Sequence, residues 1–106
     1  MRIMITARHT EVSDALRLRA EELLEKIVKH APHAQRAEVV FDDDHHRHVA
    51  ELQVYLPQGR MAVATAEADD FVAALDLAAD KLRHQLEGKV TKPGARRRAS
   101  RKRGAT

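Results

Sequence analysis

The sequence predicts a single α+β domain in which two helices pack on one face of a four-stranded sheet. The chain has 106 residues, which is enough for one compact domain. Its hydrophobic fraction of 43% supports a modest core and argues against disorder throughout the chain. Proline and glycine divide the sequence into segments with either helical or strand periodicity, in the order β-α-β-β-β-α. Two amphipathic helices can cover one face of such a sheet and leave the other face in contact with water.

The first half of the chain is expected to form a strand, a helix and a second strand. Residues 2–7 alternate in polarity and contain β-branched side chains, which is typical of a strand. Ser13 can cap a helix that runs to about His30. Residues 35–43 read as the next strand. The hydrophobic stripe of the helix consists of Leu16, Ala20, Leu23, Leu24 and Ile27.

The second half is expected to form a hairpin and a second helix. Residues 47–56 alternate between apolar and polar side chains, as in a half-buried strand. The Pro57-Gln58-Gly59 turn leads into its hairpin partner, residues 60–68. Asp69 or Asp70 can cap the second helix. The hydrophobic stripe of this helix consists of Phe71, Leu75, Ala78, Leu82 and Leu86.

Charge divides the chain into an acidic body and a basic tail. Residues 1–87 carry 11 Lys/Arg and 16 Asp/Glu, a net charge of −5, whereas residues 88–106 carry 8 Lys/Arg and no acidic residue. We expect a folded domain over residues 1–92, whose second helix frays near Thr91, and a disordered tail over residues 93–106. Such a tail favours a nucleic acid first and an anionic membrane second, and the alternative is a non-specific solubilising end. The tail residues expected to contact RNA are Arg96, Arg97, Arg98, Arg101, Lys102 and Arg103.

Each predicted helix carries charges of opposite sign on the two flanks of its hydrophobic stripe. The basic flanks contain Arg19, Lys26, Lys29 and His30 in the first helix, and Lys81, His84 and Lys92 in the second. The acidic flanks contain Asp14, Glu21 and Glu25 in the first helix, and Asp76, Asp80 and Glu87 in the second. If the two basic flanks face each other, they form a groove that can neutralise RNA phosphates. The alternative is a solvated surface with local ion pairs, which describes Arg83 between Asp80 and Glu87.

Aromatic residues are too few to form a base-stacking platform. The chain has no Trp, one Tyr and two Phe, and both Phe residues fall on predicted core positions. Proteins that bind single strands stack bases on exposed aromatic side chains. We therefore expect recognition of the backbone and shape of folded RNA, as in double-stranded RNA-binding domains.

Several other chemistries are not expected. The absence of cysteine excludes disulfides and thiol catalysis, and no apolar run reaches the length of a membrane span or a signal peptide. We find no glycine-rich phosphate loop and no nucleophile–base arrangement, so we expect a cytoplasmic protein with no enzymatic activity, cofactor or small-molecule substrate. Residues 42–48 contain acidic and histidine side chains that could bind a metal only if three or four converged. We expect a polar turn there and no metal site, and the alternative is a metal-dependent sensor.

Four segments resemble one known family in order along residues 1–92. The first two are Ile3-x-Ile5-Thr6-x-Arg8 with Glu11-Val12-Ser13-x-Ala15-Leu16-Arg17, and His48-Val49-Ala50-Glu51. The others are Ala64-x-Ala66-Glu67-Ala68-x-Asp70-Phe71-x-Ala73-Ala74-Leu75-Asp76, and Asp80-Lys81-Leu82-x-x-Gln85-Leu86. Together they are similar to the bacterial ribosome hibernation promoting factors, also called the sigma-54 modulation or ribosome-associated inhibitor family.

The resemblance implies the same β-α-β-β-β-α fold and a role in stress or stationary phase. Family members bind the small ribosomal subunit between head and body, occupy the messenger and transfer-RNA sites, and silence translation. Long members add a dimerisation domain, so this chain resembles a short form that is a monomer off the ribosome. Short members either promote or block ribosome pairing, and the resemblance leaves that choice open.

The resemblance also guides the choice of residues that bind ribosomal RNA. Arg8, Lys26, Lys29 and Lys81 correspond to basic positions of the family. Two family basic positions are replaced here by His84 and Gly88, and Lys89, Lys92 and the tail can compensate. The complete set expected to bind ribosomal RNA in the folded domain is Arg8, Arg19, Lys26, Lys29, Lys81, His84, Lys89 and Lys92. The alternative function is a generic RNA-binding module in which the tail supplies most of the affinity.

Overall fold

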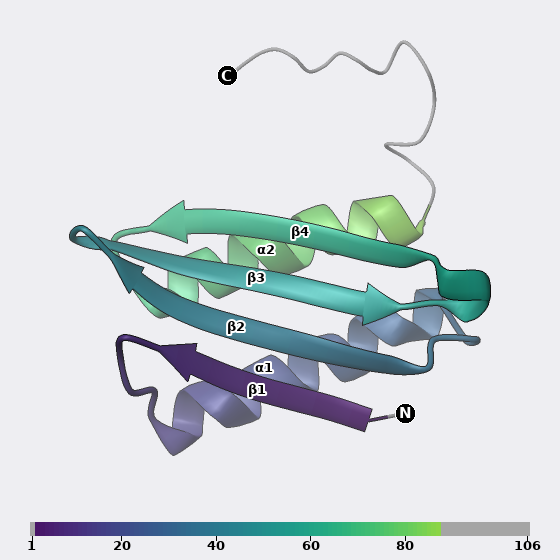
Figure 1. Cartoon of the computed structure of the whole chain (residues 1–106), viewed down its shortest axis with the longest axis horizontal. Helices are drawn as coiled ribbons and strands as arrows, with labels where there is room; N and C mark the ends of the chain where they lie inside the picture. The colour runs from purple at the N-terminus through teal and green to yellow at the C-terminus, as the bar shows by residue number, and fades with distance from the viewer. Residues whose placement is uncertain (1, 88–106) are drawn as a thin grey trace, which may run out of the picture.

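The computed structural model describes residues 2–87 and confirms the predicted order of elements (Figure 1). The elements are β1 (Arg2–Arg8), α1 (Asp14–Ile27), β2 (Arg36–Asp44), β3 (Arg47–Tyr55), β4 (Met61–Ala68) and α2 (Phe71–Leu86). Short 3₁₀ helices follow α1 and β3, at Val28–His30 and Pro57–Gly59. The expected fraying of the second helix, the RNA contacts of Lys89 and Lys92, and the basic tail lie outside the described residues.

The four strands form one sheet in the order β1-β2-β3-β4. β1 and β2 are parallel, and the other two neighbouring pairs are antiparallel. Parallel neighbours require a crossover, which α1 provides, whereas the antiparallel pairs are joined by short turns. β1 and β4 therefore point the same way, and the helix that follows each of them returns behind the same face of the sheet (Figure 1).

Side chains cap the N-termini of both helices, as expected. The Ser13 hydroxyl accepts a hydrogen bond from the Leu16 amide at 3.1 Å. Of the two candidate aspartates, Asp70 is the cap, because its carboxylate accepts a hydrogen bond from the Ala73 amide at 2.8 Å. Each cap satisfies one of the free N–H groups of a helix start, and this local chemistry sets where the helices begin.

The core lies between the sheet and the two helices. Alternate residues of the central strands, including Phe41, Leu52 and Val54, are fully buried beneath the helices. β4 contributes only alanines to this face, and α2 presents Ala74, Ala78 and Ala79 together with larger leucines. Small side chains on both surfaces let α2 lie close to β3 and β4 at native packing density.

No described helix crosses a membrane: within residues 2–87, neither α-helix has the length and hydrophobicity that a span requires.

Candidate nucleic-acid interface

The two basic helix flanks do not face each other, so the groove predicted between them is wrong. The basic flank of α1 instead meets the acidic flank of α2. Arg19 donates three hydrogen bonds to Asp76: Nη2 bonds Oδ2 at 2.9 Å and Oδ1 at 3.0 Å, and Nε bonds Oδ1 at 3.2 Å. Further along, His30 Nε2 lies 3.4 Å from the Glu87 carboxylate. The two helices run in the same direction, and each carries its basic flank on the same side when viewed along its axis. The basic flank of α1 therefore meets the acidic flank of α2.

A mixed-charge groove of about 340 Å³ results between α1 and α2. Its floor is apolar, and its walls carry both basic and acidic side chains. Hydrogen bonds to Asp76 and the charge of that carboxylate raise the pKa of Arg19 above its usual range. Arg19 therefore stays charged, but its charge is balanced by Asp76 and is only partly available to a phosphate. The charged residues that line this groove are Arg19, Lys26, His30, Asp76, Asp80 and Arg83.

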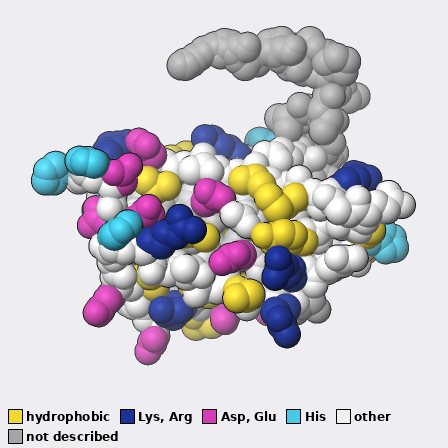
Figure 2. Space-filling view, in the orientation of Figure 1, with side chains coloured by type: hydrophobic (Ala, Val, Ile, Leu, Met, Phe, Trp, Pro, Cys, Tyr) yellow, Lys and Arg dark blue, Asp and Glu magenta, His cyan; other side chains and the backbone are white. Residues whose placement is uncertain are grey.

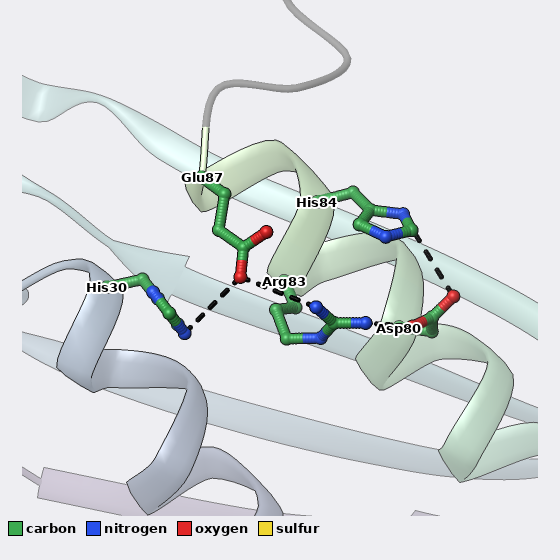
Figure 3. A network of polar contacts seen from close by, with 5 residues as sticks. All are labelled: His30, Asp80, Arg83, His84 and Glu87. Atoms are coloured by element: carbon green, nitrogen blue, oxygen red, sulfur yellow. Dashed lines mark hydrogen bonds and ion pairs between the residues drawn. The ribbon is translucent and has the colours of Figure 1, made fainter.

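A small polar network ties the last turns of the two helices together (Figure 3). The Glu87 carboxylate accepts a hydrogen bond from Arg83 at 3.4 Å and faces His30, while Arg83 also bonds Asp80. The hydrogen bond to Asp80 raises the pKa of Arg83. His84 lies on the other side of Asp80, at 4.0 Å. The local pairing expected for Arg83 is thereby confirmed, and this arginine is committed to neighbours on its own helix.

Lys81 lies on the opposite side of α2, against the open edge of β4. Its ammonium group donates a hydrogen bond to the Thr65 carbonyl at 3.0 Å. One helical turn later, the Gln85 amide donates to the Val63 carbonyl at 2.8 Å. Both carbonyls belong to the edge strand, and these contacts cover part of an edge that would otherwise be open for pairing. Lys81 is thus separated from Arg19 and Lys26 by the width of α2.

Arg8 lies at the far end of the sheet from the last turn of α1. It ends β1 and is in register with Asp42 of β2. The adjacent His9 contacts the same carboxylate through Nδ1 at 3.0 Å. The predicted RNA-binding residues of the described chain therefore do not form one cluster. They fall into three groups: Arg8 at one end, Arg19 with Lys26 and Lys29 along α1, and Lys81 with His84 on the outer side of α2.

Charge is arranged along the length of the molecule as well as around each helix. Strand register places Arg2 beside Arg36 at one end of the sheet, and Arg8, Asp42 and Glu67 at the other end. We define the basic end, where α1 and α2 finish and the β3–β4 turn lies, by Arg2, Lys26, Lys29, His30, His33, Arg36 and Arg60. We define the acidic end by Asp42, Asp43, Asp44, Glu67, Asp69 and Asp70. Figure 2 shows the open sheet face with acidic side chains gathered toward one end.

Ion pairs increase the difference in available positive charge between the basic end and the acidic end. At the acidic end, Arg47 contacts Glu67 at 3.6 Å and Asp69 at 3.1 Å, so its charge is compensated. At the basic end, the side chains of Lys26, Lys29 and Arg60 have no hydrogen-bond or ion-pair partner among residues 2–87. Glu22 and Glu25 line a shallow groove together with the two lysines and moderate their field. Glu87, which follows α2, also lies at the basic end (Figure 1).

Four arginine and histidine positions of the basic end are absent from the set predicted from the sequence. Arg2 and Arg36 start strands, Arg60 lies in a turn and His33 in a connection, so none of them belongs to a helix flank. The missing signal was topological. A chain in which α1 precedes β2, and a hairpin turn precedes β4, brings the end of α1 and that turn to the same edge of the domain.

The acidic and histidine segment at residues 42–48 forms a turn whose side chains diverge. His45 is exposed at the tip, whereas the His48 ring packs edge-on against Phe71 beneath the helices, with ring centres 4.5 Å apart. Asp42 points to the open face, where it meets His9. Among residues 2–87, no three His, Asp or Glu side chains are placed to hold a metal ion together.

The aromatic side chains are engaged in the fold. Phe41 is fully buried and contacts Phe71 edge-on at 5.4 Å between ring centres. Tyr55 lies on the open sheet face, where the Arg36 guanidinium covers its ring at 4.1 Å. Base stacking on Tyr55 would require Arg36 to move away from the face of the ring that it covers.

Both the sequence and the structure of this chain are similar to those of known proteins. The chain is 33% identical over 86 residues to a ribosome hibernation promoting factor of Azotobacter vinelandii, covering 81% of this chain and 79% of that protein. It is 32% identical over 87 residues to one of Pseudomonas putida, covering 82% and 84%. A ribosomal subunit interface protein from Coxiella burnetii superposes with a TM-score of 0.77 at 29% identity, covering 87% of this chain and 100% of that one. The N-terminal domain of Thermus thermophilus Protein Y gives 0.72 at 31% identity, covering 83% and 98%.

The match to a protein family spans nearly all of the described residues. Residues 3–92 match the family described as Sigma 54 modulation protein / S30EA ribosomal protein. The matched range contains both helices and all of the sheet except Arg2. The chain therefore belongs to the Sigma 54 modulation protein / S30EA ribosomal protein family.

Proposed function

We propose that this protein is a ribosome hibernation factor. It binds the small ribosomal subunit in the cytoplasm during stress or stationary phase and silences translation by occupying the channel for messenger and transfer RNA. The observation that carries the proposal is the family membership, supported by relatives that are named ribosome hibernation promoting factors at about one-third identity. The action is steric, by occupancy, and requires no catalytic step or cofactor.

The charge distribution supports a defined orientation on ribosomal RNA. Lys26 and Lys29 at the basic end are free to neutralise phosphates, whereas the acidic end is repelled by them. Phosphate contacts of this kind position a protein on nucleic acid without reading its sequence. We propose that the domain of residues 1–92 approaches RNA with its basic end first, and that Lys89, Lys92 and the tail add further phosphate contacts.

The remaining predicted contacts have separate roles. Lys81 and His84 face outward from α2 beside β4 and engage a second stretch of RNA backbone. Arg19 contributes less, because Asp76 already balances its charge. Arg8 contacts RNA only where the acidic end comes near the subunit. The protein acts as a monomer off the ribosome.

Co-sedimentation with purified small subunits tests this function. The full chain should bind saturably, at one copy per subunit, and messenger RNA with transfer RNA bound beforehand should block it. A full-length variant with Arg96, Arg97, Arg98, Arg101, Lys102 and Arg103 changed to Gln should bind more weakly but with the same stoichiometry. Loss of all binding in this variant, or equal affinity of the wild type for any RNA duplex, would support the generic RNA-binding module instead.

A further inference from the structure

The basic end contains a groove of about 820 Å³. Three segments far apart in the sequence form it: the connection between α1 and β2, the turn between β3 and β4, and the last turn of α2. The groove is open to solvent on one side. Its size exceeds that of a single side chain and is within the range of small-molecule sites.

Hydrogen bonds hold the walls of this groove in place. The β3–β4 turn is closed by the Leu56 amide bonding the Arg60 carbonyl at 2.8 Å, and the α1–β2 connection by the Ala34 amide bonding the Ala31 carbonyl at 2.9 Å. At the tip of the turn, Gln58 has a left-handed backbone with φ of 67°. This conformation is rare for a residue with a side chain and often occurs where a local shape is needed for binding.

The floor and rim of the groove differ in chemistry. The apolar floor includes Leu56, Pro57 and Leu86, which are half-buried. The rim carries flat cationic or ionisable groups, contributed by His30, His33 and Arg60. An RNA base needs an apolar slot closed by flat groups that can stack on it, and imidazole and guanidinium planes both serve this purpose. The same groups can donate hydrogen bonds to the phosphate of that nucleotide.

The surroundings favour an RNA strand over a protein partner. Lys26 and Lys29 flank one side of the basic end, and Arg2 and Arg36 flank the other, so cations continue beyond the groove in both directions. No carboxylate lines the groove among residues 2–87, and Glu87 of the basic end has a side chain only 15% exposed that faces Arg83 and His30. A positive surface that extends past the pocket matches a chain of phosphates that continues on both sides of one base.

We propose that this groove accepts one unpaired base of the ribosomal RNA, stacked between the His33 and Arg60 planes over the apolar floor. This proposal deepens the proposed function and rests on it. Binding would then read an irregularity in folded RNA, a bulged or looped-out nucleotide, in addition to backbone and shape. Recognition of this kind distinguishes one position on a ribosomal subunit from the regular duplex around it.

The test compares two RNA hairpins that differ by one bulged adenosine, with the full-length protein and fluorescence anisotropy as readout. The wild type should bind the bulged hairpin about tenfold more tightly, a preference within the range of one base stacked on a protein side chain. The double variant His33→Ala/Arg60→Lys keeps the arginine charge as lysine and loses both stacking planes. It should bind both hairpins equally, with unchanged affinity for the paired one.

A matched control variant makes the same two changes at the other end of the molecule. His45→Ala/Arg47→Lys alters exposed residues of the β2–β3 turn and should retain the full preference for the bulge. Equal binding of the two hairpins by the wild type, or a preference that survives in His33→Ala/Arg60→Lys, would overturn the groove proposal. Displacement of the bulged hairpin by micromolar adenosine 5′-monophosphate would also overturn it, because the groove would then be a site for free nucleotides.

Small-subunit co-sedimentation of the same variants separates this proposal from the proposed function. If the wild type binds subunits but shows no bulge preference, the groove proposal fails and the ribosome-binding function stands. If the wild type does not bind subunits at all, the proposed function itself fails.

Discussion

Arg19 of α1 and Asp76 of α2 form an ion pair with three hydrogen bonds across the surface between the helices. Their positions show that the helices run parallel, because the next contact, His30 with Glu87, lies eleven residues further along each helix. Sequence analysis assigned Arg19 and His30 to an RNA-binding groove, but in the structure they join the two helices. The surface left for RNA is consequently at the end of the domain and on the outer side of α2.

Neutralising Asp76 should release Arg19 for RNA. We expect Asp76→Asn to bind small subunits more tightly, with a salt dependence steeper by about one phosphate contact. Co-sedimentation at several salt concentrations measures both quantities. Asp69→Asn is the matched control, since it removes one negative charge beside an arginine at the acidic end, where Arg47 keeps its contact with Glu67. If the two variants change affinity equally, general charge rather than the position of Arg19 is responsible.

Lys81 should act through its charge and not through its contact with β4. Lys81→Gln removes the charge, and we expect weaker subunit binding with a salt dependence lower by about one phosphate contact. Gln85→Met is the control, because it removes the neighbouring hydrogen bond to β4 without changing charge. Equal loss of subunit binding in both variants would show that anchoring α2 to the β4 edge is what matters.

Stability should depend on which side of α2 a leucine occupies. Leu82 is fully buried against the sheet, whereas Leu77 is 51% exposed. We expect Leu82→Ala to lower the free energy of unfolding by about 2–5 kcal/mol, through lost burial and the cavity left behind. Leu77→Ala makes the same chemical change and should alter it by no more than about 0.5 kcal/mol. Urea unfolding followed by circular dichroism measures both, and similar losses would contradict the described orientation of α2.

The Ser13 cap should contribute measurably to the fold and not to binding. Ser13→Ala removes the acceptor for the Leu16 amide, and we expect the free energy of unfolding to fall by about 1 kcal/mol. Thr10→Ala serves as the control, since the Thr10 hydroxyl only contacts the neighbouring carbonyl at 3.4 Å. Subunit affinity of folded Ser13→Ala should equal that of the wild type. Weaker subunit binding by fully folded Ser13→Ala would show instead that Ser13 belongs to the interface with the subunit.

The sequence predicted the fold well because its signals are local. Caps, turns and hydrophobic period set the bounds of each element, and the strand predicted over residues 47–56 is observed at Arg47–Tyr55. The helix predicted from Ser13 to about His30 is observed as α1 followed by a 3₁₀ turn that ends at His30.

The candidate interface was only partly predictable, because it depends on how elements are placed beside each other. The segregation of charge on each helix was visible, but which flanks meet depends on helix direction. That direction follows from the sheet, in which β1 and β4 point the same way. The cluster of Arg36, Arg60 and His33 depends on strand register and on the meeting of a turn with a helix end, which no local pattern records.

The central claim is that the basic end of the folded domain, and not the tail alone, carries recognition of the subunit. The most direct measurement is co-sedimentation of full-length Lys26→Glu and Arg17→Glu with purified small subunits over rising salt. Both substitutions reverse one charge on α1, and both residues lack an ion-pair partner among residues 2–87. The account predicts that Lys26→Glu weakens binding and lowers its salt dependence, whereas Arg17→Glu, in the first half of α1, binds nearly as the wild type does. Equal binding by both variants would contradict it.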